Sequence, residues 1–314
     1  MSPGIGVYQS DMSESARAGR AWVTFAAVAI LWGIPYLWIK IVVEEGVPPA
    51  FLAWVRIVLG GAVLLGLAAR AGTLGGLRGR GRWLAVFAVT ELAVPFPLIA
   101  AGEQHVSSSL TAILIASAPL FVALLALRFD VTERPSRRQL AGLIFGLVGV
   151  AALVGIDVAG KKDELLGAAM ILAAAFGYAV GPMLFKRHLA DLDHRASMGA
   201  CLAIAALLLA PFAALSPPHV MPSAKAMAAL AGLGLFCTAA ALVLWGRLIA
   251  QMGAGRALVV TYVNPVVAVV LGMAVLGERP GIGSVVGLLL ILAGSWLATG
   301  PSAPNPLDAQ APAA

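Results

Sequence analysis

Charged side chains are scarce in this chain, and their scarcity excludes an ordinary soluble protein. Only 11% of the 314 residues are charged, whereas 61% are apolar and the mean hydropathy is +0.94. Soluble domains carry about 25% charged residues and about 45–50% apolar ones. Because so few polar groups cannot cover a surface in water, we expect a lipid bilayer to be the solvent for most of the chain.

Cysteine is nearly absent, which argues against a disulfide framework or a cysteine metal centre. The two cysteines, Cys201 and Cys237, fall inside apolar segments rather than in loops. The four histidines lack the spacing of metal ligands. We therefore predict neither a bound metal nor a cofactor.

Long apolar segments take the place of these features. A helix needs about 20 apolar residues to cross a hydrocarbon core of about 30 Å. Ten such segments fill the chain and leave no room for a soluble catalytic domain. The two ends, residues 1–20 and 300–314, are rich in Ser, Gly, Pro and Ala and are predicted to be disordered. The predicted helices span residues 22–43, 50–69, 83–102, 107–127, 139–156, 165–185, 196–215, 224–244, 257–276 and 284–299.

Lysine and arginine are distributed unevenly between the predicted loops. With a cytoplasmic N-terminus, fifteen of these residues lie on the inner side and four on the outer side. Such an excess follows the positive-inside rule. We therefore predict a multi-pass protein of the cytoplasmic membrane with both termini in the cytoplasm. The net charge of +6 then reflects topology, not nucleic-acid binding.

An internal repeat divides the chain into two units with an offset of 145 or 146 residues. We place the units at residues 21–156 and 165–299. Each unit holds five predicted helices, an odd number, so the second must be inverted relative to the first. Inverted repeats are typical of transporters, in which the two halves alternate access to a central site. The matching landmarks are Glu133-Arg134-Pro135 with Glu278-Arg279-Pro280, Gly142 with Gly287, Gly149 with Gly294, Pro119 with Pro265, and Lys40 with Lys186.

These landmarks resemble a known family. The first predicted helix contains Leu31-Trp32-Gly33 and ends in Ile39-Lys40, the second carries Arg56, and the Pro119 and Pro265 segments repeat one signature. Together they resemble the EamA-type ten-helix members of the drug/metabolite transporter superfamily. The resemblance implies a cytoplasmic-membrane carrier with a central cavity. The stretches Ile34-Pro35-Tyr36 and Glu103-Gln104-His105 depart from the family pattern and leave the substrate open.

Glu91 is the most informative single residue. It follows Trp83 by eight positions, about 12 Å along a helix, which places it near the bilayer centre. A charge there costs at least about 3 kcal/mol unless it is paired, hydrated or protonated. Glu91 is therefore a candidate cavity carboxylate that takes up protons or meets a cationic substrate group. The alternative is a buried acid hydrogen-bonded to a neighbouring helix. Pro95 and Pro97 are expected to break the helix just beyond it.

Arg56 is a candidate charge partner inside the second predicted helix. We consider three alternative roles for its side chain. The first is extension to the headgroup region, the second is pairing with Glu44 or Glu45, and the third is binding of an anionic substrate.

Two pairs of prolines occupy similar places in the two units. Pro35 pairs with Pro182, and Pro119 pairs with Pro265. Proline frees a backbone carbonyl, which lipid tolerates only where protein or water satisfies it. Matched interrupted helices are a pointer to a midplane site, so we assign all four prolines to the substrate cavity. A kink that only aids packing is the alternative.

Aromatic and amide side chains near these landmarks complete the predicted cavity. We assign Trp32, Tyr262 and Asn264 to it, because each lies near a matched proline or a repeat landmark. Asn264 is costly in lipid and should face an interior partner. Tyr36 and Trp38 are expected to be anchors at the membrane interface.

The pattern favours a secondary transporter that exports a small metabolite, amino acid or drug-like compound by alternating access. No ATP-binding motif is present, so a gradient must drive transport, and Glu91 is the natural proton site. One alternative is a membrane enzyme acting on a lipid or polyprenyl substrate, and another is a non-transporting scaffold. We predict no enzymatic activity, and we leave open a homodimer.

Overall fold

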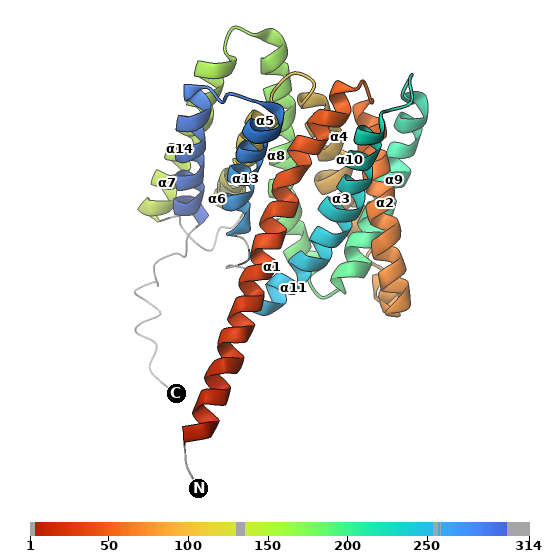
Figure 1. Ribbon diagram of the computed structural model, residues 1–314, viewed down its shortest axis with the longest axis vertical. Coiled ribbons are helices and arrows are strands. Elements are labelled where there is room, and N and C mark those ends of the chain that lie inside the picture. The colour runs from red at the N-terminus through yellow and green to blue at the C-terminus, as the bar shows by residue number, and fades with distance from the viewer. Residues whose placement is uncertain (1–3, 130–135, 254–256, 258, 300–314) are drawn as a thin grey trace.

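The computed structural model describes residues 4–129, 136–253, 257 and 259–299, and in that part of the chain it contains helices and no strands (Figure 1). The first half contains α1 (Gly4–Glu44), α2 (Pro49–Arg70), η1 (Thr73–Leu77), α3 (Gly81–Ala88), η2 (Val89–Ala93), α4 (Pro95–Gly102), α5 (Ser108–Ile115), α6 (Ala118–Phe129), α7 (Arg137–Leu153) and η3 (Val154–Val158). The second half contains α8 (Lys162–His188), α9 (His194–Leu215), α10 (Ala224–Gly234), η4 (Leu235–Ala240), α11 (Ala241–Met252), α13 (Val260–Leu276) and α14 (Ile282–Thr299).

These helices confirm the predicted membrane architecture. Eight helical segments of the described chain are long and apolar enough to cross a membrane, and two shorter apolar helices, Val260–Leu276 and Ile282–Ala298, complete the second half. Each half thus contributes five spans, so the halves run in opposite senses. The eight longer segments are Gly19–Glu44, Pro49–Arg70, Gly81–Gly102, Ser108–Leu125, Arg137–Val158, Lys162–His188, His194–Leu215 and Ala224–Met252.

The N-terminal segment differs from the expectation of disorder. α1 runs without interruption from Gly4 to Glu44, and its first part projects away from the other helices (Figure 1). Once the span has nucleated a helix, each added residue costs no further nucleation, so the helix continues into the polar segment. The C-terminal segment 300–314 and the Glu133-Arg134-Pro135 landmark lie outside the described residues.

Several spans are interrupted by a local change of helix type. η2, η3 and η4 are π-helical, and each occurs within one membrane span. In the third span the amide of Val94 donates to Val89 O (3.1 Å), and Pro95 then begins α4. Proline has no amide hydrogen and is well suited to the first turn of a helix. The expected break after Glu91 is therefore confirmed.

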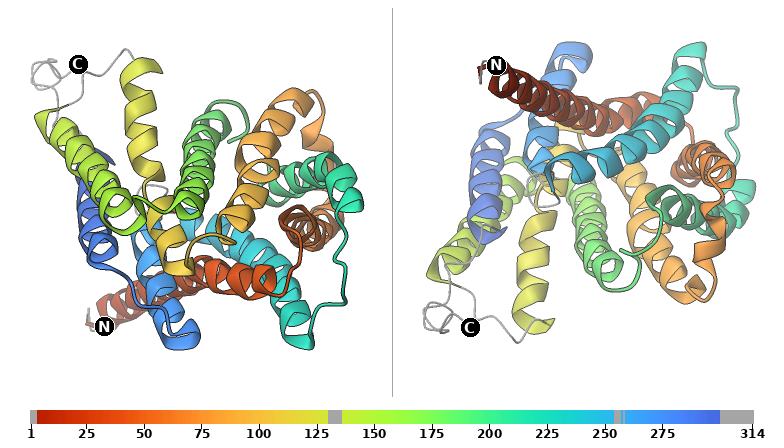
Figure 2. Two further views of the ribbon diagram at one scale, coloured as in Figure 1. Left: turned by 90° about the horizontal axis from the view of Figure 1, so that it is seen from above. Right: turned by 90° about the horizontal axis from the view of Figure 1, so that it is seen from below.

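Close helix pairs join the two halves. α7 packs along α14 (Figure 2). The two helices are so close that Gly142 and Gly149 of α7 have no room for a side chain: an added Cβ would lie 2.5 Å from Ala298 N and 2.7 Å from Leu290 Cβ, respectively. α2 packs along α9, where a Cβ on Gly61 would lie 3.1 Å from Leu202 Cβ. Small residues let helix backbones approach in a bilayer, as at membrane helix interfaces generally. The fifth span therefore pairs with the tenth and the second with the seventh.

Acidic side chains bind helix N-termini of the opposite half at one end of the bundle. We call this end the Glu44 end; it carries Glu44, Glu45, Glu103, Asp157 and Glu278. The carboxylate of Glu278 accepts from the amides of Ser108 (2.8 Å) and Ser109 (3.0 Å), which begin α5. Asp157 accepts from Gly283 and Ser284 at α14 (3.1 and 2.6 Å), and Glu45 accepts from the amide of Ser223 before α10 (2.9 Å). Each acid meets free amide groups and the positive end of a helix dipole, which ties the halves together.

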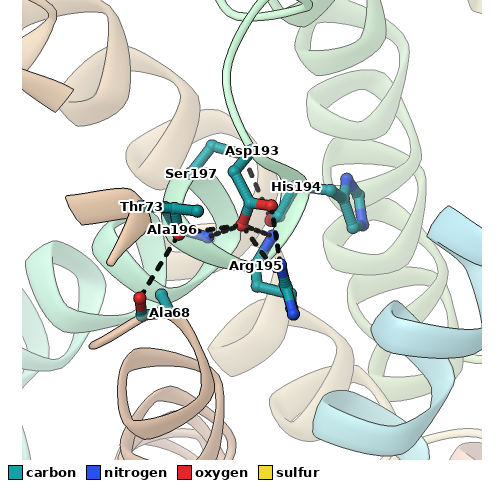
Figure 3. Close-up of polar contacts among 7 residues, drawn as sticks. All are labelled: Ala68, Thr73, Asp193, His194, Arg195, Ala196 and Ser197. Carbon is teal, nitrogen blue, oxygen red and sulfur yellow. Dashed lines mark hydrogen bonds and ion pairs between the residues drawn. The ribbon is translucent and has the colours of Figure 1, made fainter. Parts of the chain in front are cut away.

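A different contact joins the halves at the opposite end, which carries Arg70. Asp193 caps α9 by accepting from the amides of Arg195 (3.1 Å) and Ala196 (3.0 Å), and it also accepts from Thr73 Oγ1 of the first half (3.2 Å; Figure 3). Arg80 of the first half pairs with Asp191 of the second at 2.6 Å. Polar contacts between the halves thus exist at both ends of the bundle.

Candidate substrate site

Arg56 is a buried cation in the second span. Only 8% of the residue is exposed, its Nε donates to Thr238 Oγ1 (2.9 Å), and its guanidinium carbon lies 4.0 Å from the centroid of the Phe96 ring. The hydroxyl of Thr238 in turn donates to Leu233 O (2.8 Å). An aromatic face and one hydroxyl satisfy only part of a guanidinium, which has five N–H donors.

Glycines bring α2 close to the junction of α10 and η4, which allows this contact. A Cβ on Gly60 would lie 2.7 Å from Thr238 Cγ2, and a Cβ on Gly234 would lie 2.5 Å from Leu59 Cβ. η4 also turns more widely than an α-helix, a feature that often marks functional sites. The position of Thr238 therefore depends on small residues in both helices.

Arg56 has no acidic partner among the described residues. One of the three alternatives, pairing with Glu44 or Glu45, is not seen, because Glu44 pairs with Lys40 at 3.6 Å and Glu45 is bound to Ser223. Extension to the headgroups is also not seen, because the guanidinium is held by Thr238 and Phe96. A buried guanidinium without a counter-ion is unfavourable, so the site is suited to bind an anion.

Glu91 lies in η2, half-buried, and faces a neighbouring helix. Its Oε1 is buried and has no hydrogen-bond partner in the described part of the chain. A side chain on Gly181 of α8 would overlap its carboxylate, so Glu91 points towards α8. Tyr178 of α8 and Cys201 of α9 lie within electrostatic range of Glu91. The alternative role for Glu91 was a buried acid hydrogen-bonded to a neighbouring helix. Its Oε1 atom makes no such hydrogen bond in the described chain.

Two tyrosines, Tyr36 and Tyr178, lie within electrostatic range of Arg56. Tyr178 interacts electrostatically with Arg56, Tyr36 and Glu91. Tyr36 lies within electrostatic range of Glu103 and Arg56, and its expected role as an interface anchor stays a prediction. Trp32, Tyr36 and Lys40 are spaced by four residues, which places them on one face of α1.

The remaining predicted cavity residues lie along α1, α13 and α14. The Trp32 ring packs on that of Trp245 with centroids 5.0 Å apart. The Asn264 amide, with its nitrogen facing acceptors, donates to Val260 O (2.8 Å) and to Ala29 O of α1 (3.2 Å). Asn264 thus has the interior partner that was expected, and it links α13 to α1.

Tyr262 makes a contact between helices, and the predicted prolines lie at different places in their helices. The Tyr262 hydroxyl donates to Ser295 O of α14 (3.3 Å). Pro35 and Pro265 lie inside the continuous helices α1 and α13, and Pro119 lies at the start of α6, after a break in the fourth span. The side chain of Pro182 lies outside the described residues. Pro119 and Pro265 are therefore equivalent in sequence but only the first accompanies an interruption.

Comparison with known proteins places the chain in a family. The family model for the EamA-like transporter family matches residues 20–155 and again residues 165–300. The chain belongs to the EamA-like transporter family. It is therefore a multi-pass membrane transporter of small molecules.

Several relatives are known by name. The inner membrane transporter YedA of Escherichia coli, itself described as uncharacterized, is 31% identical over 80% of this chain and 81% of its own length. A probable amino-acid metabolite efflux pump of Salmonella typhimurium is 26% identical over 86% of this chain and 91% of its own. A probable terminal-alkyne amino-acid exporter of Streptantibioticus cattleyicolor is 31% identical over 74% and 78%, respectively.

One solved crystal structure shares the fold. It superposes with a TM-score of 0.64, covers 90% of this chain and 97% of its own, and is 24% identical in sequence. Within the described residues, no group of three or more His, Cys, Asp or Glu side chains is arranged to hold a metal ion.

Proposed function

We propose that the chain exports an amino acid or a closely related metabolite across the cytoplasmic membrane by alternating access of its two halves. Arg56 carries this proposal, because it is a buried cation without an acidic partner among the described residues. A substrate carboxylate would supply the missing charge and hydrogen bonds. Two relatives are named for amino-acid export, which supports this substrate class. Transport is favoured over the membrane enzyme and the scaffold.

Glu91 is the proposed second recognition group. Its carboxylate is available to meet the ammonium group of an amino acid or to bind a proton when that group is absent. Tyr178 lies within electrostatic range of both Arg56 and Glu91, which supports one site containing all three residues. A zwitterionic substrate would then neutralise both buried charges.

The remaining cavity assignments stay part of the proposal. Trp32, Pro35, Pro119, Pro182 and Pro265 are proposed to line the route of the substrate. Tyr262 and Asn264, which bridge helices, are proposed to hold that wall in place. The two halves are proposed to move as units 21–156 and 165–299.

The proposed orientation places both termini in the cytoplasm and the Glu44 end outside. The excess of arginine and lysine in the loops at the other end supports it. Single cysteines at Asp163 and Arg70, in a chain lacking Cys201 and Cys237, test it with an impermeant thiol reagent on intact cells. Labelling at position 163 alone is expected, and labelling at position 70 alone would reverse the topology.

A matched series of ligands tests the role of Arg56. The amino acid that most stabilises the purified protein in a thermal-shift panel is compared with its decarboxylated amine. Hydrogen bonds to a charged group contribute about 1.5–3 kcal/mol, so the wild type should bind the amino acid about 10- to 100-fold more tightly than the amine. Arg56→Gln should remove this preference.

Arg70→Gln is the control for that experiment, because Arg70 is exposed at the end of the same helix. It should keep the full preference for the amino acid. An equal preference in Arg56→Gln and wild type would refute a carboxylate site at Arg56. Tighter binding of the amine by the wild type would instead favour a cationic substrate held by Glu91.

A further inference from the structure

Two stacked rings join the halves at the end of the bundle that carries Arg70. The Trp83 indole of α3 and the His188 imidazole of α8 have centroids 3.5 Å apart, and their planes are inclined by only 5°. Phe87 and Phe185 continue this contact further into the bundle, with centroids 5.6 Å apart. Trp83 stands near the start of one membrane span and His188 ends another. The stacked pair therefore lies where two neighbouring helices reach the membrane boundary.

Arg80 fixes this junction of α3 and α8 from the loop before α3. Its guanidinium donates to His188 O (2.6 Å) and forms an ion pair with Asp191 (2.6 Å). The other acid in the loop between α8 and α9, Asp193, pairs with Arg195 at 3.0 Å. Both acids of this loop are thus matched by an arginine, and neither is left to neutralise a further cation.

Two further arginines flank the stacked rings and are exposed. The guanidinium carbon of Arg82 lies 4.7 Å from the centroid of the Trp83 ring. Arg187 directly precedes His188 in α8, and both arginines lie within electrostatic range of that histidine. Neither arginine forms an ion pair with an acid of the described chain. The junction therefore carries two positive charges that no carboxylate of the described residues neutralises.

An exposed apolar strip, formed by Val86 and Val89, continues along the helix from Arg82. The two valines follow Arg82 by four and seven positions, so all three side chains share one face. Val86 is 42% exposed and Val89 is 39% exposed. Both belong to the membrane span Gly81–Gly102, where hydrocarbon is the solvent. A cation at the boundary next to an apolar strip matches the two parts of a phospholipid, its phosphate and its acyl chain.

We propose that Arg82 and Arg187 bind the phosphate of an anionic phospholipid, whose acyl chain lies along Val86 and Val89. The planar guanidinium group matches a phosphate with two parallel hydrogen bonds. Basic sites between membrane helices at the membrane surface are suited to anionic headgroups. This ligand is distinct from the transported substrate, so the inference holds whatever compound the chain carries.

A phospholipid suits this junction better than a small soluble anion does. Soluble phosphate would meet the arginines and leave the apolar strip without a partner, whereas a phospholipid supplies a phosphate at the boundary and a chain beside it. Arg82 belongs to the first half and Arg187 to the second, so one headgroup would bridge the halves next to the stacked rings. Bound lipid is therefore expected to stabilise this arrangement of the two halves.

Lipid binding to the purified protein tests the site. The delipidated protein in a neutral detergent is titrated with dioleoyl phosphatidylglycerol or dioleoyl phosphatidylcholine, which carry the same chains but differ in net charge. Native mass spectrometry counts the bound lipids. The wild type should bind phosphatidylglycerol on the order of 30-fold more tightly than phosphatidylcholine, as expected for two basic groups at a membrane surface. Arg82→Gln/Arg187→Gln should reduce this preference to about threefold or less.

Arg70→Gln/Arg247→Gln is the matched control, because it removes the same charge from exposed arginines of α2 and α11. It should keep the preference for phosphatidylglycerol within about twofold of wild type. Equal losses in the two double variants would show only a general attraction to positive charge and would overturn the site. A wild type that does not distinguish the two lipids would also overturn it.

Unfolding temperatures distinguish a lipid from a soluble anion. Phosphatidylglycerol should raise the unfolding temperature of the wild type, whereas inorganic phosphate at the same concentration should not. Equal stabilisation by inorganic phosphate would overturn the assignment to a lipid. If Arg82→Gln/Arg187→Gln does not fold, Arg187→Gln alone takes its place, with an expected loss of about fivefold in affinity for phosphatidylglycerol. Unchanged affinity in that variant would refute the site.

Discussion

The third and eighth spans each contain a π-helical turn, but the side chains in the two turns differ. A π-helical turn begins at Val89 in the first half and at Leu235 in the second, 146 positions later. The repeat that relates the two halves therefore extends to an irregular feature of the helix. At equivalent positions inside the turns stand Glu91 and Cys237. The two turns share their place in the repeat but not their side chains: the first carries the acid Glu91, and the second carries Cys237 followed by Thr238, whose hydroxyl accepts from Arg56.

This difference suggests why a transporter built from two similar halves has an asymmetric site. An acid in both turns would pair one carboxylate with Arg56 and cancel the charge that an anionic substrate needs. The second half instead presents Cys237 and the hydroxyl of Thr238, so this turn offers Arg56 no carboxylate. The two repeats have the same fold, but their different side chains keep the cation Arg56 apart from the acid Glu91.

The largest expected effect comes from making the two turns alike. Cys237→Asp places a carboxylate within electrostatic range of Arg56. An ion pair should form and should weaken amino-acid binding on the order of 100-fold, as expected for the loss of one partner of a buried charge pair. Cys237→Asn has a similar shape without the charge and should bind within about tenfold of wild type. Affinity measured by calorimetry decides between the two, and unchanged binding in Cys237→Asp would contradict the account.

A second prediction concerns the space that the acidic turn requires. Gly181→Ala puts a methyl group where the Glu91 carboxylate lies. Overpacking of this kind should destabilise the protein by about 1–3 kcal/mol. The double variant Gly181→Ala/Glu91→Ala should recover most of that loss, because the overlapping group is gone. Gly66→Ala, in a helix with open space around it, is the control and should unfold at or above the wild-type temperature. Equal unfolding temperatures for the Gly181 single and double variants would show that Glu91 does not face α8.

Thr238→Val and Thr90→Val compare the hydroxyls of the two turns directly. Thr238 accepts from Arg56, whereas Thr90 in η2 donates only to the backbone oxygens of Val86 and Phe87 in the described structure. Thr238→Val should weaken amino-acid binding by about three- to tenfold, the effect of one hydrogen bond. Thr90→Val should leave it unchanged. Equal effects of the two substitutions would remove Thr238 from the site.

The smallest effect is expected at the Glu44 end. Hydrogen bonds from the Ser223 hydroxyl and amide lower the pKa of Glu45. A carboxyl group whose pKa is lower in the folded state contributes stability above its unfolded pKa and loses it as the pH falls through its folded pKa. Glu45→Gln should therefore unfold more readily than wild type near neutral pH and equally at strongly acidic pH. Melting curves across this pH range test the sign, and a difference that grows on acidification would be incompatible with it.

The helical architecture was predictable because few backbone structures satisfy their hydrogen bonds within a lipid bilayer. Backbone groups must be satisfied within each span, so ten apolar segments imply ten helices, and five per unit imply inversion. The breaks near Pro95 and Pro119 follow from the missing amide of proline. Glu91 was recognised because a charge in an apolar segment is conspicuous in any sequence.

The contacts of the site were not predictable to the same degree. Arg56 meets Thr238, which is 182 positions away, and no local pattern encodes that contact. Glu103 stands at the end of a span, where a polar residue is ordinary, so its complete burial shows only in the folded chain. Tyr36 was assigned to the interface because tyrosine is common there, and only the folded chain brings it within electrostatic range of Arg56 and Glu103.

A structure of the protein with its amino-acid substrate tests the central claim most directly. We expect the substrate carboxylate about 2.7–2.9 Å from the Arg56 guanidinium, with the ammonium group on the Glu91 side. A bound substrate elsewhere, with Arg56 still contacting only Thr238 and Phe96, would contradict the account.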